Sequence, residues 1–303
     1  MIREENANQS FPRLSERAIQ YGLSSNLNGI LTRPPSKTET NQPCLVILNA
    51  GILHKAGPNR LHVRLARAAA QRGFPTFRFD FAGVGDSPPR GDGRPLAEGV
   101  LVDIAETLDL LEARLGASRF ILAGLCSGAD NSLRAARTDS RVVGAALLDP
   151  TVHRTPRWYL NHYLPRLRSR ERVSQFFSLE NANLKTISKT LNRRFREGPE
   201  KERPELFRTG LSDKQDIAQH IEDTLRRGCR LFYGFTGGWK EYYNYPEQLL
   251  ELYPNLSRPD RIHVRHYPET SHTFKTDGDR NRLIKDLTDW MELIQTTRKV
   301  NVS

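Results

Sequence analysis

Gly124-Leu125-Cys126-Ser127-Gly128 is the stretch that decides the fold of this 303-residue chain. An apolar run at residues 120–123 precedes it, and a segment with helical patterning at residues 129–136 follows it. A strand, a sharp turn between two glycines and a helix are the context in which a G-x-S-x-G pattern is credible, because such a turn exposes its central side chain at the end of a sheet. Cysteine stands at that centre, so Cys126 is the candidate nucleophile.

The register of this pattern is unambiguous. Centring it on Ser127 would require glycine at positions 125 and 129, where the chain has Leu125 and Ala129. A free cysteine is often a plain core residue, but the centre of such a turn points outward, over the N-terminus of the following helix. That N-terminus and a neighbouring imidazole would both stabilise a thiolate.

The rest of the chain predicts an α/β fold with a mostly parallel sheet and helices on both faces. Apolar runs alternate with helical patterns in the order that this architecture requires. The expected strands span residues 27–32, 44–49, 74–79, 120–123, 142–148, 230–235 and 261–267, and the expected helices span residues 59–72, 96–115, 129–136 and about 277–297.

The pattern changes after Pro150, where a charged, helix-rich segment without a convincing strand begins. An inserted helical segment between two strands is expected to lie over the strand ends, where α/β folds have their sites. The predicted organisation is a polar N-terminal tail (1–17), the first part of the core (18–150), a helical lid insertion (151–228) and the second part of the core (229–298).

Composition restricts the compartment. No apolar run approaches the roughly 18 residues that a membrane span needs, and the polar N-terminus of mixed charge lacks a hydrophobic signal segment. We therefore expect a cytoplasmic protein with no membrane span. The three cysteines have unrelated spacings, which predicts neither a disulfide framework nor a zinc site. Cys44 and Cys229 border apolar runs and are expected to be core residues.

The net charge of +11 is concentrated in one segment. Residues 151–230 contain 18 lysines and arginines against 10 acidic residues. A basic surface fits nucleic acid, an anionic membrane, an acidic partner or simple solubility. The segment has no zinc-finger, RNA-recognition or basic-zipper signature and is interrupted by prolines, so we expect no nucleic-acid partner. Solubility and an anionic partner or substrate stay open.

The order of strands, the turn at Cys126, the stretch from Asp80 to Ser87, and His272 together resemble the α/β-hydrolase superfamily over residues 18–298. Several stretches are similar to those of bacterial hydrolases associated with exosortase systems. The cysteine elbow is also similar to that of dienelactone hydrolases, which lack a lid of this size, and of polyhydroxyalkanoate synthases, which are longer chains. The stretches similar to those of the exosortase-associated hydrolases are residues 49–51, 57–60, 78–80, 83–87 and 124–129.

The resemblance implies a triad in the chain order nucleophile, acid, histidine. His272 follows the last expected strand and precedes the last helix, so its loop reaches the end of the sheet that carries the turn. An acid is needed to hold the imidazole tautomer. Glu241, just past the strand at 230–235, is the first candidate, and Asp149, past the preceding strand, is the alternative.

An oxyanion hole needs two backbone N–H groups. One is expected from Ser127, and the other from Gly51 or Ile52 in the loop after the strand at 44–49. The nearby stretch 83–87 contains a lone G-x-G, which we expect to form a structural turn rather than a phosphate cradle.

Aromatic and histidine side chains near the expected site are candidates for a substrate pocket. They are His54, His153, Trp158 and Tyr242. The aromatic members can equally form the packing between the lid and the core.

These features predict acyl transfer through a thioester on Cys126, with His272 as the base. With water as the second nucleophile the enzyme is an esterase or thioesterase. With an amine, alcohol or thiol it is an acyltransferase, and the basic lid would suit an acyl group carried on coenzyme A or an acidic acyl-carrier protein. A non-catalytic binding protein on the same fold is the third hypothesis. The sequence shows no metal-ligand cluster and no dinucleotide fingerprint, so neither a metal nor a cofactor is expected.

Overall fold

An eight-stranded sheet forms the centre of the computed structural model, which describes residues 14–22, 26–35, 42–167 and 213–296. The strand order is β1-β2-β4-β3-β5-β6-β7-β8. The pairs β1–β2 and β2–β4 are antiparallel, and all the other pairs are parallel. The strands are β1 (Ser15–Tyr21), β2 (Leu27–Arg33), β3 (Cys44–Ile47), β4 (Thr76–Asp80), β5 (Phe120–Leu125), β6 (Val142–Leu148), β7 (Arg230–Thr236) and β8 (Ile262–Tyr267).

The predicted mostly parallel sheet is confirmed, and the seven expected strands are present within a few residues of their expected bounds. The strand β1 was not expected. It begins at Ser15, inside the predicted polar tail, and Ile19 is its only buried residue. An edge strand of this kind has no apolar run to reveal it, and its backbone pairing with β2 is what orders it.

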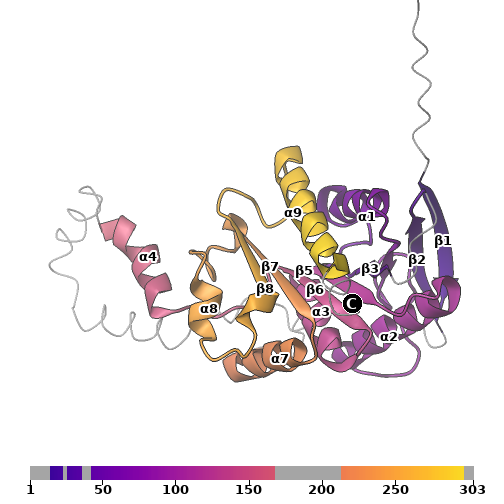
Figure 1. Ribbon diagram of the computed structural model, residues 1–303, viewed down its shortest axis with the longest axis horizontal. Helices are drawn as coiled ribbons and strands as arrows, with labels where there is room; N and C mark the ends of the chain where they lie inside the picture. Colours follow the sequence, from indigo (N-terminus) through magenta and orange to yellow (C-terminus); the bar gives the residue numbers. More distant parts are fainter. Residues whose placement is uncertain (1–13, 23–25, 36–41, 168–212, 297–303) are drawn as a thin grey trace, which may run out of the picture.

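Helices cover both faces of the sheet (Figure 1). On one face lie α1 (Leu61–Gln71) and α9 (Asp277–Thr296), and on the other lie α2 (Leu96–Leu115), α3 (Ser127–Thr138) and α7 (Lys214–Arg226). No helix in the described part of the chain combines the length and the apolar character of a membrane span.

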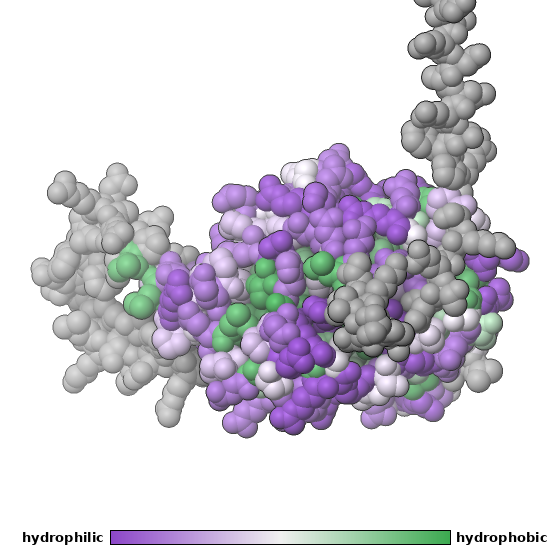
Figure 2. Space-filling view, viewed as in Figure 1, coloured by the Kyte–Doolittle hydropathy of each residue, from purple (hydrophilic) through white to green (hydrophobic). Residues whose placement is uncertain are grey.

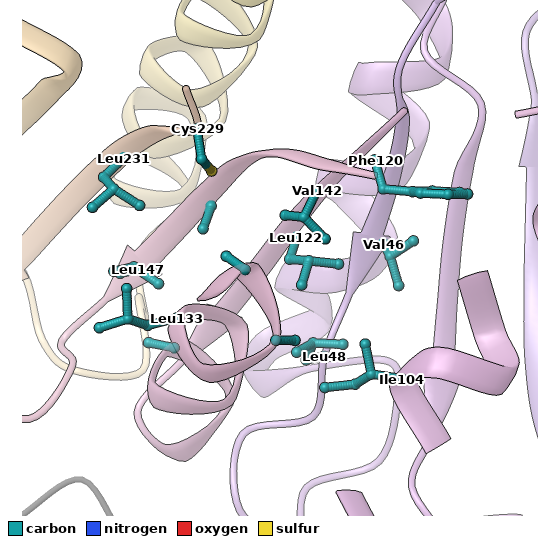
Figure 3. Packing of buried hydrophobic residues seen from close by; sticks show 14 of the residues in the cluster. Val46, Leu48, Ile104, Phe120, Leu122, Leu133, Val142, Leu147, Cys229 and Leu231 are labelled. Carbon is teal, nitrogen blue, oxygen red and sulfur yellow. The ribbon is translucent and has the colours of Figure 1, made fainter. Parts of the chain in front are cut away.

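Each face has its own apolar cluster, because successive side chains of a strand point to opposite sides. In β3, Leu45 and Ile47 pack with α1 and α9, whereas Val46 and the next residue after the strand, Leu48, pack with α2 and α3. Figure 3 shows the second cluster, in which Leu133 of α3 lies over the sheet. The cysteines Cys44 and Cys229 are buried, as expected for core residues.

The predicted insertion 151–228 has two described parts with different surroundings. The helix α4 (Pro156–Leu167) extends away from the sheet (Figure 1), and its Leu160 is 63% exposed. Figure 2 shows apolar surface on this projecting helix. In contrast, α7 buries Ile217 and Ile221 in the core beside α3. The core layer therefore includes α7, and the residues between the two helices lie outside the described part.

Candidate active site

The turn between β5 and α3 holds Cys126 in a strained conformation. Its φ is 57° and its ψ is −121°, a region that residues with a side chain rarely adopt. The flanking glycines permit the turn, because a Cβ on Gly124 would lie 2.2 Å from the Gly128 backbone and one on Gly128 would lie 2.4 Å from the Asn49 carbonyl oxygen. Unlike the two buried core cysteines, the Cys126 side chain is partly exposed.

His272 reaches this turn from the loop after β8. Its Nδ1 donates a hydrogen bond of 2.7 Å to Oδ2 of Asp149. Because an ionised carboxylate only accepts, the Nδ1 atom carries a proton and Nε2 is left for Cys126, whose side chain also interacts with the imidazole. The side chains of Cys126, His272 and Asp149 thus lie together at the carboxyl ends of β5, β8 and β6.

Asp149 is fully buried and anchored on two sides. The backbone N–H of Thr236 donates to Oδ1 at 2.7 Å, and the Thr236 hydroxyl donates to Oδ2 at 2.6 Å. Its φ of 45° again places a non-glycine residue in the left-handed region. A carboxylate held by these donors can orient the imidazole without moving.

Electrostatics favour a charged His272. Burial lowers its pKa, but the hydrogen bonds to Asp149 and Cys126 and the negative charges on both groups outweigh burial and raise the pKa from 6.5 to about 9. The imidazole therefore carries a proton at neutral pH. This positive charge lies beside the Cys126 side chain.

The first candidate for the acid, Glu241, does not occupy this position. Its side chain is exposed, and its backbone carbonyl accepts a hydrogen bond from Arg154 Nε at 2.7 Å. The short 3₁₀ turn η4 (Gly237–Trp239) follows β7 directly and separates Glu241 from the histidine. Asp149, the alternative, is the carboxylate that the structure places on His272.

The Trp239 ring lies beside the His272 imidazole. The sequence did not predict this contact. The two rings are stacked, with centroids 4.9 Å apart and planes 16° from parallel. A Cβ on Gly238 would lie 2.2 Å from the His272 backbone nitrogen, so only glycine lets η4 approach this closely. The Gly237-Gly238-Trp239 run directly after a strand was the available signal.

The expected oxyanion loop lies over the turn, but one of its donors is engaged. The N–H of Gly51 donates to Oγ of Ser127 at 2.9 Å, so it is not free in this structure. The Ile52 side chain is 70% exposed, and the Ile52 N–H bonds to no other described residue. The Ser127 N–H, at the first position of α3, has no intrahelical partner.

A second buried network supports this loop, and sequence reasoning did not anticipate it. Lys55 is 4% exposed, and its ammonium bonds to Oδ2 of Asp80 at 2.7 Å and also to Asp86. Asp80 further accepts from the N–H groups of Lys55 and Asp86 and from the Asn49 amide. The stretch 83–87 is thus the structural turn that we expected, tied to Asp80.

The carboxylates Asp80 and Asp86 and the His54 imidazole lie close enough together to hold a metal ion. The Lys55 ammonium, however, bonds to both carboxylates and lies 3.0 Å from His54 Nε2. A lysine ammonium already supplies the positive charge there, which disfavours a cation at this cluster.

The four pocket candidates separate into two groups. His54 belongs to the Lys55 network, where it contacts Asp86. The other three lie where the chain entering α4 meets the loop after β7. Trp158 is buried and donates from Nε1 to the Lys240 carbonyl, and Gln248 bonds to the His153 carbonyl. The Tyr242 ring lies 5.1 Å from the Trp239 ring at an angle of 38°, and Trp239 in turn stacks on His272.

The alpha/beta hydrolase fold family model matches residues 45–228, and the chain belongs to this family. Solved structures agree with it on the fold. An esterase of Pyrococcus furiosus is 13% identical with a TM-score of 0.56, over 92% of this chain and 90% of its own.

Two further solved structures have the same fold. A proline iminopeptidase of Mycobacterium smegmatis is 13% identical with a TM-score of 0.56, over 94% of this chain and 100% of its own. An alpha-beta serine hydrolase homologue from Coxiella burnetii is 17% identical with a TM-score of 0.54, over 91% of this chain and 96% of its own. No curated protein sequence matched the chain.

Proposed function

We propose that this protein hydrolyses an ester or thioester through a thioester acyl-enzyme on Cys126. The observation that carries the proposal is His272, which bonds to the buried Asp149 through Nδ1 and interacts with the Cys126 side chain at the strained turn. A cysteine with an imidazole oriented by a third group is the arrangement of an activated nucleophile.

In the first step the Cys126 thiolate attacks the carbonyl carbon, and the carbonyl electron pair moves to oxygen. The tetrahedral adduct then collapses and expels the alcohol or thiol, which takes the proton from His272 Nε2. In the second step neutral His272 accepts a proton from water while the water oxygen attacks the thioester. The carboxylic acid leaves, and Cys126 departs as thiolate. Asp149 keeps the imidazole in one tautomer throughout.

Transfer to an amine, alcohol or thiol is the second candidate function, and a feature at the base of the lid favours an anionic donor for it. The Arg154 guanidinium lies over the Trp158 ring at 4.6 Å and the Tyr242 ring at 5.4 Å. The Tyr242 ring in turn packs at a tilt against Trp239, which stacks on the histidine. A positive charge fixed in this way suits an acyl group on coenzyme A or an acidic carrier protein.

Turnover of a panel of 4-nitrophenyl esters and acyl-coenzyme A thioesters, with and without amine acceptors, tests the proposal. We expect release of free acid from at least one donor, loss of that activity in Cys126→Ala, and retention in Cys229→Ala, which removes a buried thiol of the core. Product formed only with an acceptor would favour transfer. No turnover of any donor would favour the binding-protein hypothesis.

A further inference from the structure

The Ser127 hydroxyl accepts a hydrogen bond from one of the backbone N–H groups that the sequence predicts for an oxyanion hole. Ser127 directly follows the nucleophile, and its Oγ accepts the Gly51 N–H at 2.9 Å. The residue is only 9% exposed. The donor expected from the loop after β3 therefore points at the serine side chain.

This contact leaves the hydroxyl with an unused donor. A hydroxyl has one hydrogen to donate and two lone pairs that accept, and the Gly51 N–H uses one lone pair. Ser127 Oγ donates to no other residue in the described part of the chain. By contrast, the hydroxyl of Ser132 in the same helix donates to the Gly128 carbonyl at 2.8 Å.

We propose that the Ser127 hydroxyl is a donor of the oxyanion hole, and that the Gly51 N–H holds and polarises it rather than binding the substrate oxygen directly. The second donor is the Ser127 N–H at the N-terminus of α3. Accepting a hydrogen bond strengthens the O–H as a donor, and the helix N-terminus favours negative charge at the same point.

The buried network around Asp80 also fixes the position of the Gly51 N–H. Asn49 Nδ2 bonds to the Leu53 carbonyl and to Asp80, which fixes both ends of the turn that contains Gly51. A fixed Gly51 N–H keeps the serine oxygen in one place. Donors that are aligned before charge develops are the ones that stabilise a transition state.

This inference rests on the proposed thioester acyl-enzyme, and two reactions of Cys126 separate the two claims. Acylation by an activated ester develops an oxyanion, whereas alkylation by iodoacetamide does not. Both rates are to be measured by intact mass for wild type, Ser127→Ala, Ser127→Thr and the matched control Ser132→Ala, with thermal unfolding of each variant.

For Ser127→Ala we expect acylation to fall by roughly 10²-fold, with alkylation changed less than about twofold because the thiol keeps its surroundings. Ser127→Thr keeps a hydroxyl and is expected to recover much of the rate, while Ser132→Ala is expected to acylate like wild type. Acylation of Ser127→Ala at or above the wild-type rate would overturn the assignment and show that the hydroxyl blocks Gly51. A wild-type protein that alkylates but never acylates would overturn the proposed function itself, and this inference with it.

Discussion

Two buried aspartates lie at the carboxyl ends of β4 and β6, with β3 and β5 between these strands, and each aspartate is paired with a basic side chain. Asp80 ends β4 and bonds to Lys55, while Asp149 follows β6 and bonds to His272. Both carboxylates are completely inaccessible to solvent. Their partners differ, since the Lys55 side chain is 4% exposed and that of His272 is 29% exposed.

The difference in exposure separates a structural pair from a reactive one. The Lys55 ammonium bonds to both Asp80 and Asp86, so Lys55 fixes the loop after β3. His272 bonds to Asp149 through Nδ1, and its other ring nitrogen is left for Cys126. Under the proposed function, Asp149 and His272 form the reactive pair because His272 keeps its second ring nitrogen for Cys126, and Asp80 and Lys55 form the structural pair.

The largest effect is expected from breaking the reactive pair. Asp149→Asn removes the charge that fixes the His272 tautomer, and we expect turnover to fall by roughly 10³–10⁴-fold with the fold intact. Glu241→Gln is the matched control and is expected to change turnover less than about twofold, because its side chain is exposed. Steady-state kinetics on the best donor measure the turnover of both variants. A larger loss of turnover in Glu241→Gln than in Asp149→Asn would identify Glu241 as the acid.

Breaking the structural pair should act on stability instead. Lys55→Met leaves Asp80 buried without its countercharge, which typically costs about 3–5 kcal/mol. Urea denaturation followed by circular dichroism measures the free energy of unfolding. Lys240→Met, at an exposed lysine, is the control, with an expected change below about 0.5 kcal/mol. Equal stabilities of the two variants would mean that the Lys55 network does not stabilise the fold.

The reactive pair should also give stability a pH dependence. The pKa of His272 is raised from 6.5 to about 9 in the folded protein. The folded protein therefore binds the imidazole proton more tightly than the unfolded chain does. The resulting stability, about 3 kcal/mol, is fully present below pH 6.5 and is lost as the pH rises through 9. The measurement is the difference in unfolding free energy between wild type and His272→Gln at pH 6 and pH 10. A difference that does not shrink toward pH 10 contradicts the charged pair.

The smallest effect concerns the aromatic ring on the histidine. A ring face stabilises an adjacent cation by about 0.5–2 kcal/mol, so Trp239→Leu should lower the pKa of His272 and reduce turnover by roughly 3–10-fold. Trp239→Phe retains a ring and should restore most of the His272 pKa and most of the turnover. The pH profile of kcat/KM reports the shift. An unchanged profile in Trp239→Leu would reduce the tryptophan to a packing role.

The sequence was informative where local geometry determines position. The glycines around Cys126 and the place of His272 after the last strand were sufficient to predict where both residues lie. The acid was harder, because Asp149 and Glu241 each follow a strand. The choice depends on the η4 turn and on Trp239, which come from tertiary packing.

The remaining features could not be read from one-dimensional patterns. Lys55 gives no signal of burial, since lysine is rarely buried and its partners lie 25 and 31 residues away. The engagement of Gly51 by the Ser127 hydroxyl likewise joins groups 76 residues apart. Contacts of this range are set by the sheet order, in which β3 lies beside β5.

The central claim is that Cys126 becomes acylated, and the most direct test is the intact mass of the protein after brief incubation with activated esters and acyl thioesters. The account predicts one acyl group per chain on wild type, none on Cys126→Ala, and an adduct on Asp149→Asn that forms far more slowly. An adduct that survives in Cys126→Ala, or a wild-type protein that turns over substrate without ever carrying a Cys126 thioester, would contradict it.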